Sequence, residues 1–287
     1  MAAPDDMFRT IDISDPRFES EGLRCVTVKS AALRGRGDLT VWAPAGTTPA
    51  ALVVLLHGVY GSHWCWTLRG GAHRTAARLV AAGAIPPLAL AMPSDGLRGD
   101  GTGYVRHGDG ADFGRWIVDE VPAAARAALP ALDHSAPLFL AGLSMGGFGA
   151  LRLGATHAAR VGAISGHSSI THVSQMSQFV EEDVALLRTD PAEASALDAL
   201  VAAGEALPPL RFDCGIDDQL ITENRALHAA LEARGIPHVY EEYPGTHEWA
   251  YWEAHVEDTL RFFATVLQVS ASDGDSMATR PGDRGRD

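Results

Sequence analysis

A serine that can act as a nucleophile lies at the centre of Gly-Leu-Ser-Met-Gly, residues 142–146. A serine hydroxyl attacks carbonyl carbon atoms when a neighbouring base takes its proton. The apolar run PLFLA before this pentapeptide predicts a strand, and the pattern GFGALRLGA predicts a helix after it. In such a turn the serine backbone is strained, and Gly142 and Gly146 allow other segments to pass closely. We therefore predict that Ser144 is a catalytic nucleophile.

The acid and the base that Ser144 requires are expected further along the chain, in the order serine, acid, histidine. The segment LRFDCGIDDQLI places Asp217 and Asp218 just after a predicted strand. Asp218 is our candidate acid, although the spacing alone does not distinguish it from Asp217. His247 is the candidate base because it lies in a glycine-containing loop, PGTHEW, after the expected strand HVYEEY.

Two backbone amides are expected to stabilise the negative charge that develops on the attacked carbonyl oxygen. One belongs to Met145, at the start of the helix that follows the serine. The other belongs to Val59, in the segment HGVYG after an early predicted strand, with Tyr60 as the alternative donor. His57 directly precedes a glycine in this segment, which indicates a structural role in the turn rather than a role as base.

Two aromatic residues near these positions, Tyr60 and Trp249, are candidate substrate-binding residues. Trp249 follows the candidate base and forms a group with Tyr251 and Trp252. Such a group is also typical of core packing, so both interpretations stay open for it.

The remaining histidines do not indicate a metal site. His63, His73 and His107 are not accompanied by HxH, HExxH or a similar ligand spacing. We expect them to be solvated, and we expect neither a metal nor a cofactor.

Strand and helix patterns alternate through the middle of the chain, which predicts an α/β fold with a mostly parallel sheet covered by helices on both faces. In such a sheet ligands bind near the carboxyl ends of the strands. The expected strands are residues 51–58, 87–94, 136–144, 161–166 and 210–215, and the expected helices are 73–83, 113–129, 148–158 and 224–235.

The domain organisation follows from the same patterns. We expect an N-terminal extension over residues 1–22 and a single domain over 23–269, which opens with an antiparallel hairpin over 23–43. Residues 167–209 lack a clear strand pattern and are expected to form an excursion near the site. Residues 270–287 are rich in Ser, Gly, Asp and Arg, which predicts a disordered tail.

Composition limits the partners. The chain has 23 Lys and Arg against 36 Asp and Glu, a formal net charge of −13, which disfavours nucleic acid and anionic membranes. The N-terminal residues resemble no secretory signal, and no apolar run approaches about 18 residues, so we expect a cytoplasmic protein. Cys25, Cys65 and Cys214 are expected to be reduced. The oligomeric state is left open, with a homodimer as one option.

Five motifs occur in order along the chain: LLHGVYGSHWCW, AMPSDG, LAGLSMGGFGALRL, CGIDDQL and PGTHEWAYWE. Together they resemble the esterase D family of α/β-hydrolases, and within it the tributyrin esterase type, which is related to S-formylglutathione hydrolases, feruloyl esterases and mycolyltransferases. The resemblance implies an α/β-hydrolase fold. It also implies Ser144 as nucleophile, Asp218 as acid and His247 as base, with the amides of Val59 and Met145 as oxyanion donors.

These features predict a serine carboxylesterase that hydrolyses short-chain acyl esters of small molecules through an acyl-enzyme. The HGxxG form after the early strand departs from S-formylglutathione hydrolases, so a glutathione thioester is a second choice. The secreted feruloyl and xylan esterases usually carry signal peptides or sugar-binding modules, which are not seen here. The same triad would serve an acyltransferase, and a non-catalytic binding member of the fold is a further alternative.

Overall fold

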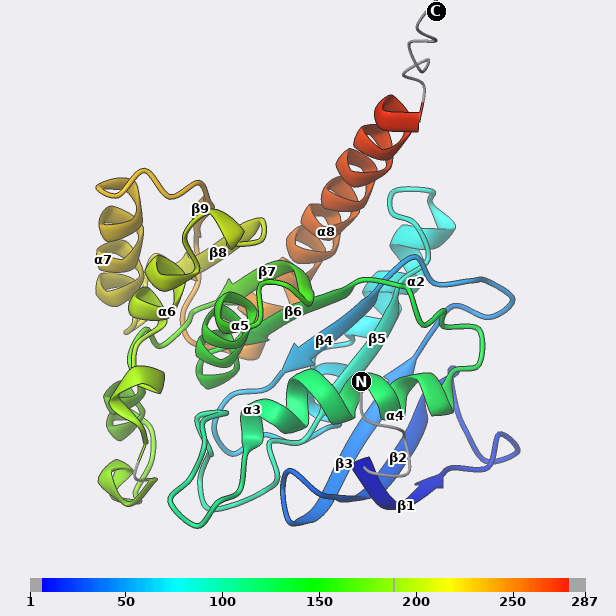
Figure 1. The fold of residues 1–287 in the computed structure, drawn as a ribbon, viewed down its shortest axis with the longest axis horizontal. Helices are drawn as coiled ribbons and strands as arrows, with labels where there is room; N and C mark the ends of the chain where they lie inside the picture. The colour runs from blue at the N-terminus through cyan, green and yellow to red at the C-terminus, as the bar shows by residue number, and fades with distance from the viewer. Residues whose placement is uncertain (1–6, 188, 279–287) are drawn as a thin grey trace, which may run out of the picture.

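A nine-stranded sheet forms the centre of the molecule, with the strand order β1-β2-β3-β5-β4-β6-β7-β8-β9 (Figure 1). The computed structural model describes residues 7–187 and 189–278. The strands are β1 (Phe8–Ile13), β2 (Arg24–Ser30), β3 (Gly35–Trp42), β4 (Leu52–Leu56), β5 (Ala89–Pro93), β6 (Leu138–Leu143), β7 (Val161–His167), β8 (Leu210–Gly215) and β9 (Val239–Tyr243).

The sheet has an antiparallel end and a parallel end. Strands β1, β2 and β3 pair antiparallel, and β3 pairs antiparallel with β5. From β5 to β9 all neighbours are parallel, so the carboxyl ends of these strands meet at one edge. This arrangement confirms the predicted α/β-hydrolase fold.

The central strands are buried on both faces because their side chains alternate between two hydrophobic cores. On β4, Val54 and Leu56 belong to one core, and Val53 and Leu55 belong to the other. All five residues of this strand are buried. This is why the segment reads in the sequence as a continuous apolar run rather than as an alternating one.

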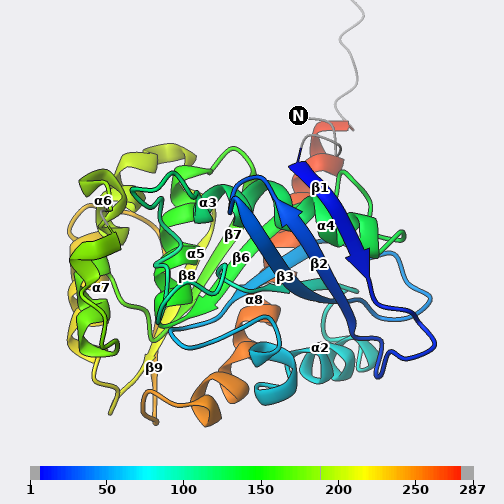
Figure 2. The ribbon, with the colours of Figure 1, turned by 90° about the horizontal axis from the view of Figure 1, so that it is seen from below.

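Helices cover both faces of the sheet, and Figure 2 shows α2 and α8 on the side opposite to α3, α4 and α5. The helices α6 and α7 lie beside the β8 and β9 end of the sheet (Figure 1). Their bounds are α2 (Ala72–Ala81), α3 (Phe113–Arg115), α4 (Val121–Ala128), α5 (Met145–Thr156), α6 (Ala196–Ala203), α7 (Ile221–Glu232) and α8 (Trp249–Ala278).

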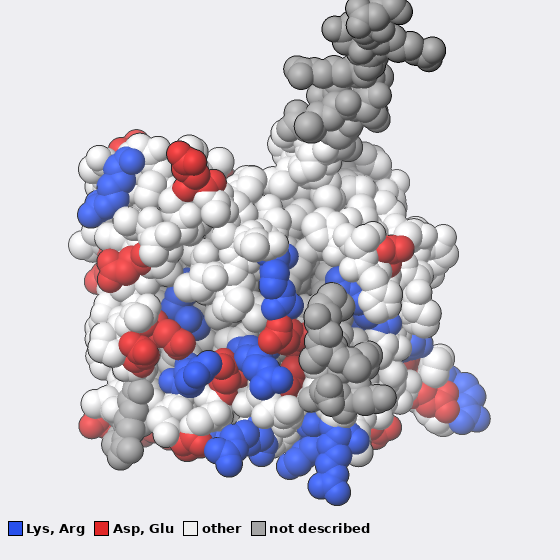
Figure 3. Space-filling model, in the orientation of Figure 1, with Lys and Arg blue, Asp and Glu red and all other residues white. Residues whose placement is uncertain are grey.

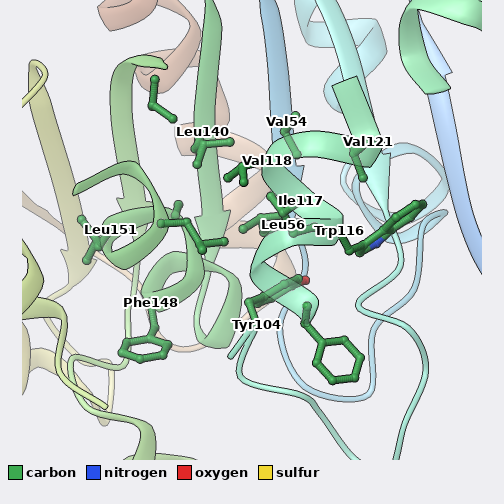
Figure 4. Close-up of a cluster of buried hydrophobic side chains, with 14 of the residues drawn as sticks. Val54, Leu56, Tyr104, Trp116, Ile117, Val118, Val121, Leu140, Phe148 and Leu151 are labelled. Atoms are coloured by element: carbon green, nitrogen blue, oxygen red, sulfur yellow. The ribbon is translucent and has the colours of Figure 1, made fainter. Parts of the chain in front are cut away.

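One core holds the ends of β4 and β6 rigidly beneath α4 and α5. Figure 4 shows Leu140 of β6 beside Val118 and Leu56 of β4 beside Ile117, in the same core as Trp116 of the segment that leads into α4. Trp116 is fully buried, and its indole N–H donates to the carbonyl of Ser94 at 2.8 Å. Close packing of this kind holds backbone positions tightly, so the loops that leave β4 and β6 start from well-defined positions.

The two ends of the chain differ from expectation. Residues 8–13 of the expected N-terminal extension form β1, which adds to the edge of the sheet beside the predicted hairpin β2–β3. This strand is mostly exposed, so its sequence lacks the apolar alternation of a half-buried strand. Helix α8 continues to Ala278, so residues 270–278 of the expected disordered tail are helical. The rest of that tail, 279–287, lies outside the described residues.

The segment between β7 and β8 contains several short helical turns and α6, in place of a further strand. The turns are η3 (Val173–Gln178), η4 (Val184–Leu187), η5 (Pro191–Glu193) and η6 (Gly204–Ala206).

On the face of the molecule shown in Figure 3, acidic and basic side chains are interspersed. Among the described helices, none has the length and apolar character needed to cross a membrane.

Candidate active site

Ser144 occupies the sharp turn between β6 and α5. Its φ of 55° and ψ of −119° are unusual for a residue with a side chain, and such a conformation costs about 1–3 kcal/mol. A Cβ atom on Gly142 would lie 2.2 Å from the carbonyl oxygen of Gly146, and one on Gly146 would lie 2.3 Å from that of Leu56. The two glycines are therefore required because the turn packs backbone against backbone.

The structure brings Ser144 together with His247 and Asp218. The Nε2 atom of His247 lies 3.0 Å from the Oγ atom of Ser144. Its Nδ1 atom lies 3.0 Å and 3.1 Å from the two carboxylate oxygens of Asp218. With the ring proton on Nδ1, the imidazole donates to the carboxylate and accepts from the serine hydroxyl. This is the geometry of a nucleophile, base and acid.

Burial and orientation separate Asp218 from the neighbouring Asp217. Asp218 is 2% exposed, whereas Asp217 is exposed. The amide of Leu220 donates to Asp218 Oδ1 at 2.8 Å and fixes the carboxylate. The spacing of the sequence could not distinguish these two acids, because only their side-chain directions differ.

The surroundings of Asp218 keep it ionised. Burial opposes ionisation, but the hydrogen bond and the attraction from His247, together with the Leu220 amide, hold the pKa of Asp218 below its usual value of 3.8. A carboxylate charged at neutral pH can stabilise an imidazolium when His247 accepts a proton.

Aromatic rings limit the movement of His247. The ring of Phe179 lies 5.0 Å from the imidazole, centroid to centroid, at an interplanar angle of 31°. Trp252 meets the imidazole edge-on, also at 5.0 Å. The His247 side chain is 16% exposed as a result. Phe179 lies in the 167–209 segment, and it was not predicted because that segment has helical pieces but no motif that indicates a functional residue.

The predicted oxyanion donors lie in the two backbone segments that flank Ser144. Within the described part of the chain, the amide N–H groups of Val59 and Met145 donate no hydrogen bond. The Tyr60 amide is already engaged, since it donates to the carbonyl of Asp100 at 2.8 Å. A Cβ atom on Gly58 would lie 3.2 Å from the Cβ of Ser144, so this loop packs directly on the serine. The geometry therefore favours Val59 over Tyr60.

His57 serves the turn in which it lies. It is 2% exposed, and its Nδ1 donates to the carbonyl of Gly58 at 2.6 Å. Its Nε2 accepts from the amide of Asp95 at 3.1 Å. Both ring nitrogens are engaged, so His57 connects the loop after β4 to the loop after β5.

The two predicted substrate-binding residues are placed differently. Tyr60 is 62% exposed, and its hydroxyl donates to Asp100 at 3.2 Å. The ring of Trp249 packs edge-on against Trp66 at 5.7 Å and Trp252 at 5.4 Å. Trp252 in turn contacts the ring of His247, and contact with a substrate stays a prediction for both Tyr60 and Trp249.

The three histidines considered for a metal have separate partners. His63 bonds with Thr40, His73 bonds with Glu21, and His107 bonds with the carbonyl of Thr102. In residues 7–187 and 189–278, no group of three or more His, Cys, Asp and Glu side chains is arranged to hold a metal ion.

A protein family and a known protein that are similar in sequence are both described as esterases. Residues 30–263 match the family described as "Putative esterase". An acetyl esterase of Caldicellulosiruptor saccharolyticus is 26% identical over 230 residues, which cover 74% of this chain and 82% of that protein.

Solved structures share the fold. A ferulic acid esterase superposes with a TM-score of 0.72 at 22% identity, covering 90% of this chain and 99% of the other. The S-formylglutathione hydrolase FrmB of Staphylococcus aureus superposes with a TM-score of 0.71 at 20% identity, covering 89% and 99%. The family match confirms the resemblance that the motifs indicated. The chain belongs to this esterase family, and it is a carboxylic ester hydrolase.

Proposed function

We propose that this chain hydrolyses short-chain acyl esters of small molecules through an acyl-enzyme on Ser144. The observation that carries the proposal is the continuous contact from Ser144 through His247 to the buried Asp218, with steps of 3.0 Å and 3.0 Å. No cofactor enters the proposed reaction, because the nucleophile, base and acid are all side chains of this chain.

In the first half of the reaction, Ser144 Oγ attacks the ester carbonyl carbon while His247 Nε2 takes the hydroxyl proton. The former carbonyl oxygen carries a negative charge in the tetrahedral intermediate, and it accepts hydrogen bonds from the free amides of Val59 and Met145. Each such donor lowers the barrier by about 3 kcal/mol. The carbon–oxygen bond to the alcohol breaks, His247 returns the proton to the leaving alkoxide, and the acyl group stays on Ser144.

In the second half, water takes the place of the alcohol. His247 removes one proton from the water as it attacks the acyl carbon, and the same two amides stabilise the second intermediate. The bond to Ser144 Oγ then breaks, His247 returns the proton to the serine, and the carboxylic acid leaves. Asp218 remains ionised and orients the imidazole in both halves.

Close packing beside the two segments that carry the proposed oxyanion donors supports a short acyl group. A Cβ atom on Gly101 would lie 2.7 Å from the sulfur of Met145, 3.1 Å from Val59 and 3.3 Å from Met176. On another side, the ring of Phe179 covers His247. The name of the curated relative, an acetyl esterase, agrees with this substrate class.

The proposal is tested by replacing the nucleophile. We expect Ser144→Ala to lose at least about 10⁴-fold in kcat for p-nitrophenyl acetate, because the residues of such a triad act as a unit. Ser135→Ala, an exposed serine in the turn before β6, is the matched control and should keep wild-type activity. A fluorophosphonate should label the wild type and the control only. Retention of most of the activity in Ser144→Ala would rule out the proposal.

A further inference from the structure

A group of buried polar side chains lies beneath the candidate active site and takes no part in the proposed reaction. Its central member is Asp213 of β8, which is fully buried. Asp213 accepts from the guanidinium of Arg211 and, at 2.7 Å, from the hydroxyl of Tyr251. Nδ1 of His167 lies 2.9 Å from its second oxygen.

His167 extends this group toward α8. Its Nε2 atom lies 2.8 Å from the hydroxyl of Thr259, and that hydroxyl lies 2.6 Å from the hydroxyl of Ser165. All three side chains are fully buried. Strands β7 and β8 and helix α8 are thus linked by one set of polar contacts, which we call the Asp213 network (Ser165, His167, Arg211, Asp213, Tyr251 and Thr259).

Backbone contacts connect the network to two residues of the candidate triad. The amide of Ser144 donates to the carbonyl of His167 at 2.9 Å. The amide of Ser168 donates to the carbonyl of Asp213 at 2.8 Å, and Asp213 lies on the strand that leads to Asp218. The positions of the nucleophile and the acid therefore depend on the same two strands that the network joins.

Tyr251 connects the network to the third residue of the triad. It lies in the first turn of α8, directly after the loop that carries His247. A Cβ atom on Gly245 would lie 2.7 Å from the Tyr251 ring, so the start of this loop rests on the ring. The hydroxyl of Tyr251 thus anchors its own ring and the loop of His247 to Asp213. Asp213 is also connected to the serine turn through His167, and to Asp218 through strand β8.

The charges of this network are costly to bury. Burial opposes ionisation of Asp213, but His167 and Arg211 outweigh it and lower its pKa to about 2. Burial beside this carboxylate raises the pKa of Tyr251, so its hydroxyl stays protonated and donates. Well-packed apolar residues often stabilise a core as well as a buried ionic group does or better, so stability alone gives a weak account of the network.

We propose that Asp213 and Tyr251 are positioning residues, which hold the loop of His247 and the strand of Asp218 in register with Ser144. This inference rests on the proposed function, because it assigns a role in the reaction to residues that do not touch the substrate. Reaction rates are sensitive to such register, since a misplacement of about 1 Å can cost roughly 10²-fold.

Tyr251→Phe is the variant that tests this role, because it removes one hydroxyl and keeps the ring against Gly245. The matched control is Tyr240→Phe on the edge strand β9, where the hydroxyl donates to Glu242 at 2.9 Å without contact to the network. We expect Tyr251→Phe to lower kcat about 10-fold and to leave KM unchanged, where kcat is calculated from the active-site concentration found by titrating Ser144. Tyr240→Phe should match the wild type.

A spectroscopic measurement distinguishes failure of this inference from failure of the proposed function. The proton between His247 Nδ1 and Asp218 should give a downfield ¹H NMR resonance, assigned by its loss in Asp218→Asn. We expect Tyr251→Phe to broaden or remove this signal and Tyr240→Phe to retain it, whether or not the chain hydrolyses esters. An unchanged resonance in Tyr251→Phe, or a wild-type kcat in an active enzyme, would overturn the inference. An intact wild-type resonance without hydrolysis would instead overturn the proposed function.

Discussion

Two buried carboxyl groups, one at each end of the sheet, have pKa values that are shifted in opposite directions. Glu120 lies beneath the antiparallel end and accepts from the hydroxyl of Ser30 at 2.5 Å and from the amide of Ala32 at 2.8 Å. Burial raises the pKa of Glu120, because these two hydrogen bonds offset the lost hydration only in part. Asp218, at the parallel end, has a pKa below its usual value.

The partner of each carboxyl group explains this difference. The hydrogen bonds of Glu120 come from neutral groups, and they tie β2 to the helical segment beneath it. Asp218 faces a histidine that can become positively charged, and this histidine in turn contacts a serine. Glu120 and Asp218 thus differ in their partners: the partner of Asp218 can gain a proton during a reaction, whereas the partners of Glu120 cannot.

The largest expected effect comes from replacing Asp218 by its amide, in comparison with the same change at Glu120 and at Asp217. We expect Asp218→Asn to lower kcat for p-nitrophenyl acetate by about 10³- to 10⁴-fold, because an amide no longer stabilises the imidazolium or selects its tautomer. For Glu120→Gln, and for Asp217→Asn next to Asp218 in the sequence, kcat should stay within about twofold of the wild-type value. Steady-state kinetics on the three variants checks this. Equal losses in Asp217→Asn and Asp218→Asn would remove the distinction that burial makes between these acids.

The next effect concerns two glycines, one in the serine turn and one in a surface loop. Gly146→Ala should destabilise the fold by about 1–3 kcal/mol or more, because its Cβ would lie 2.3 Å from the backbone oxygen of Leu56. Gly46, between β3 and β4, has a φ of +70° and no atom within 4 Å of an added Cβ. Gly46→Ala should therefore cost only about 1 kcal/mol, from backbone strain alone. Urea denaturation measures both, and an equal cost would contradict the backbone packing at the serine turn.

A smaller effect is expected from the aromatic cover of the site. Phe179→Ala removes the ring that lies 5.0 Å from the His247 ring. We expect the ratio of kcat/KM for p-nitrophenyl butyrate to that for the acetate to rise by roughly 10-fold, since about 1–3 kcal/mol is typical for a methylene in a pocket. Phe262→Ala, a half-buried phenylalanine on α8 outside the site, is the control and should leave the ratio unchanged. An unchanged ratio in Phe179→Ala would remove Phe179 from the account of chain length.

The smallest effect is the pH dependence of stability at Glu120. A carboxyl group with a raised pKa stabilises the fold below its unfolded value, about 4.5, and this contribution is lost as pH rises through the folded pKa. Glu120→Gln does not titrate, so its Tm should improve relative to the wild type as pH rises from about 4.5 towards neutral. A Tm difference that is independent of pH would show that Glu120 does not titrate in this way.

Much of this arrangement was predictable from the sequence, for physical reasons. The apolar runs predicted the buried strands β4, β5, β6, β7 and β8, because strands buried on both faces leave an uninterrupted pattern. Ser144 was predictable because a tight strand-to-helix turn requires glycine at fixed spacings. The edge strand β1 was missed because exposed residues carry no such requirement.

Contacts between distant segments could not be predicted in the same way. The choice of Asp218 over Asp217 depends on which side chain points inward, and the spacing of a loop does not determine this. Phe179 approaches His247 from a segment with no motif that indicates a functional residue. The Asp213 network joins residues from β7, β8 and α8. Asp213 and Tyr251 lie in the quoted segments LRFDCGIDDQLI and PGTHEWAYWE, but neither pattern indicates that the two residues meet.

Trapping the acyl-enzyme tests the central claim most directly. The wild type is mixed with p-nitrophenyl acetate, quenched in acid within milliseconds, digested and analysed by peptide mass spectrometry, with Ser144→Ala treated in parallel. Our account predicts one acetyl group on Ser144 of the wild type and none on the corresponding peptide of the variant. Rapid hydrolysis with no acetylated peptide, or with the acetyl group on another residue, would contradict it.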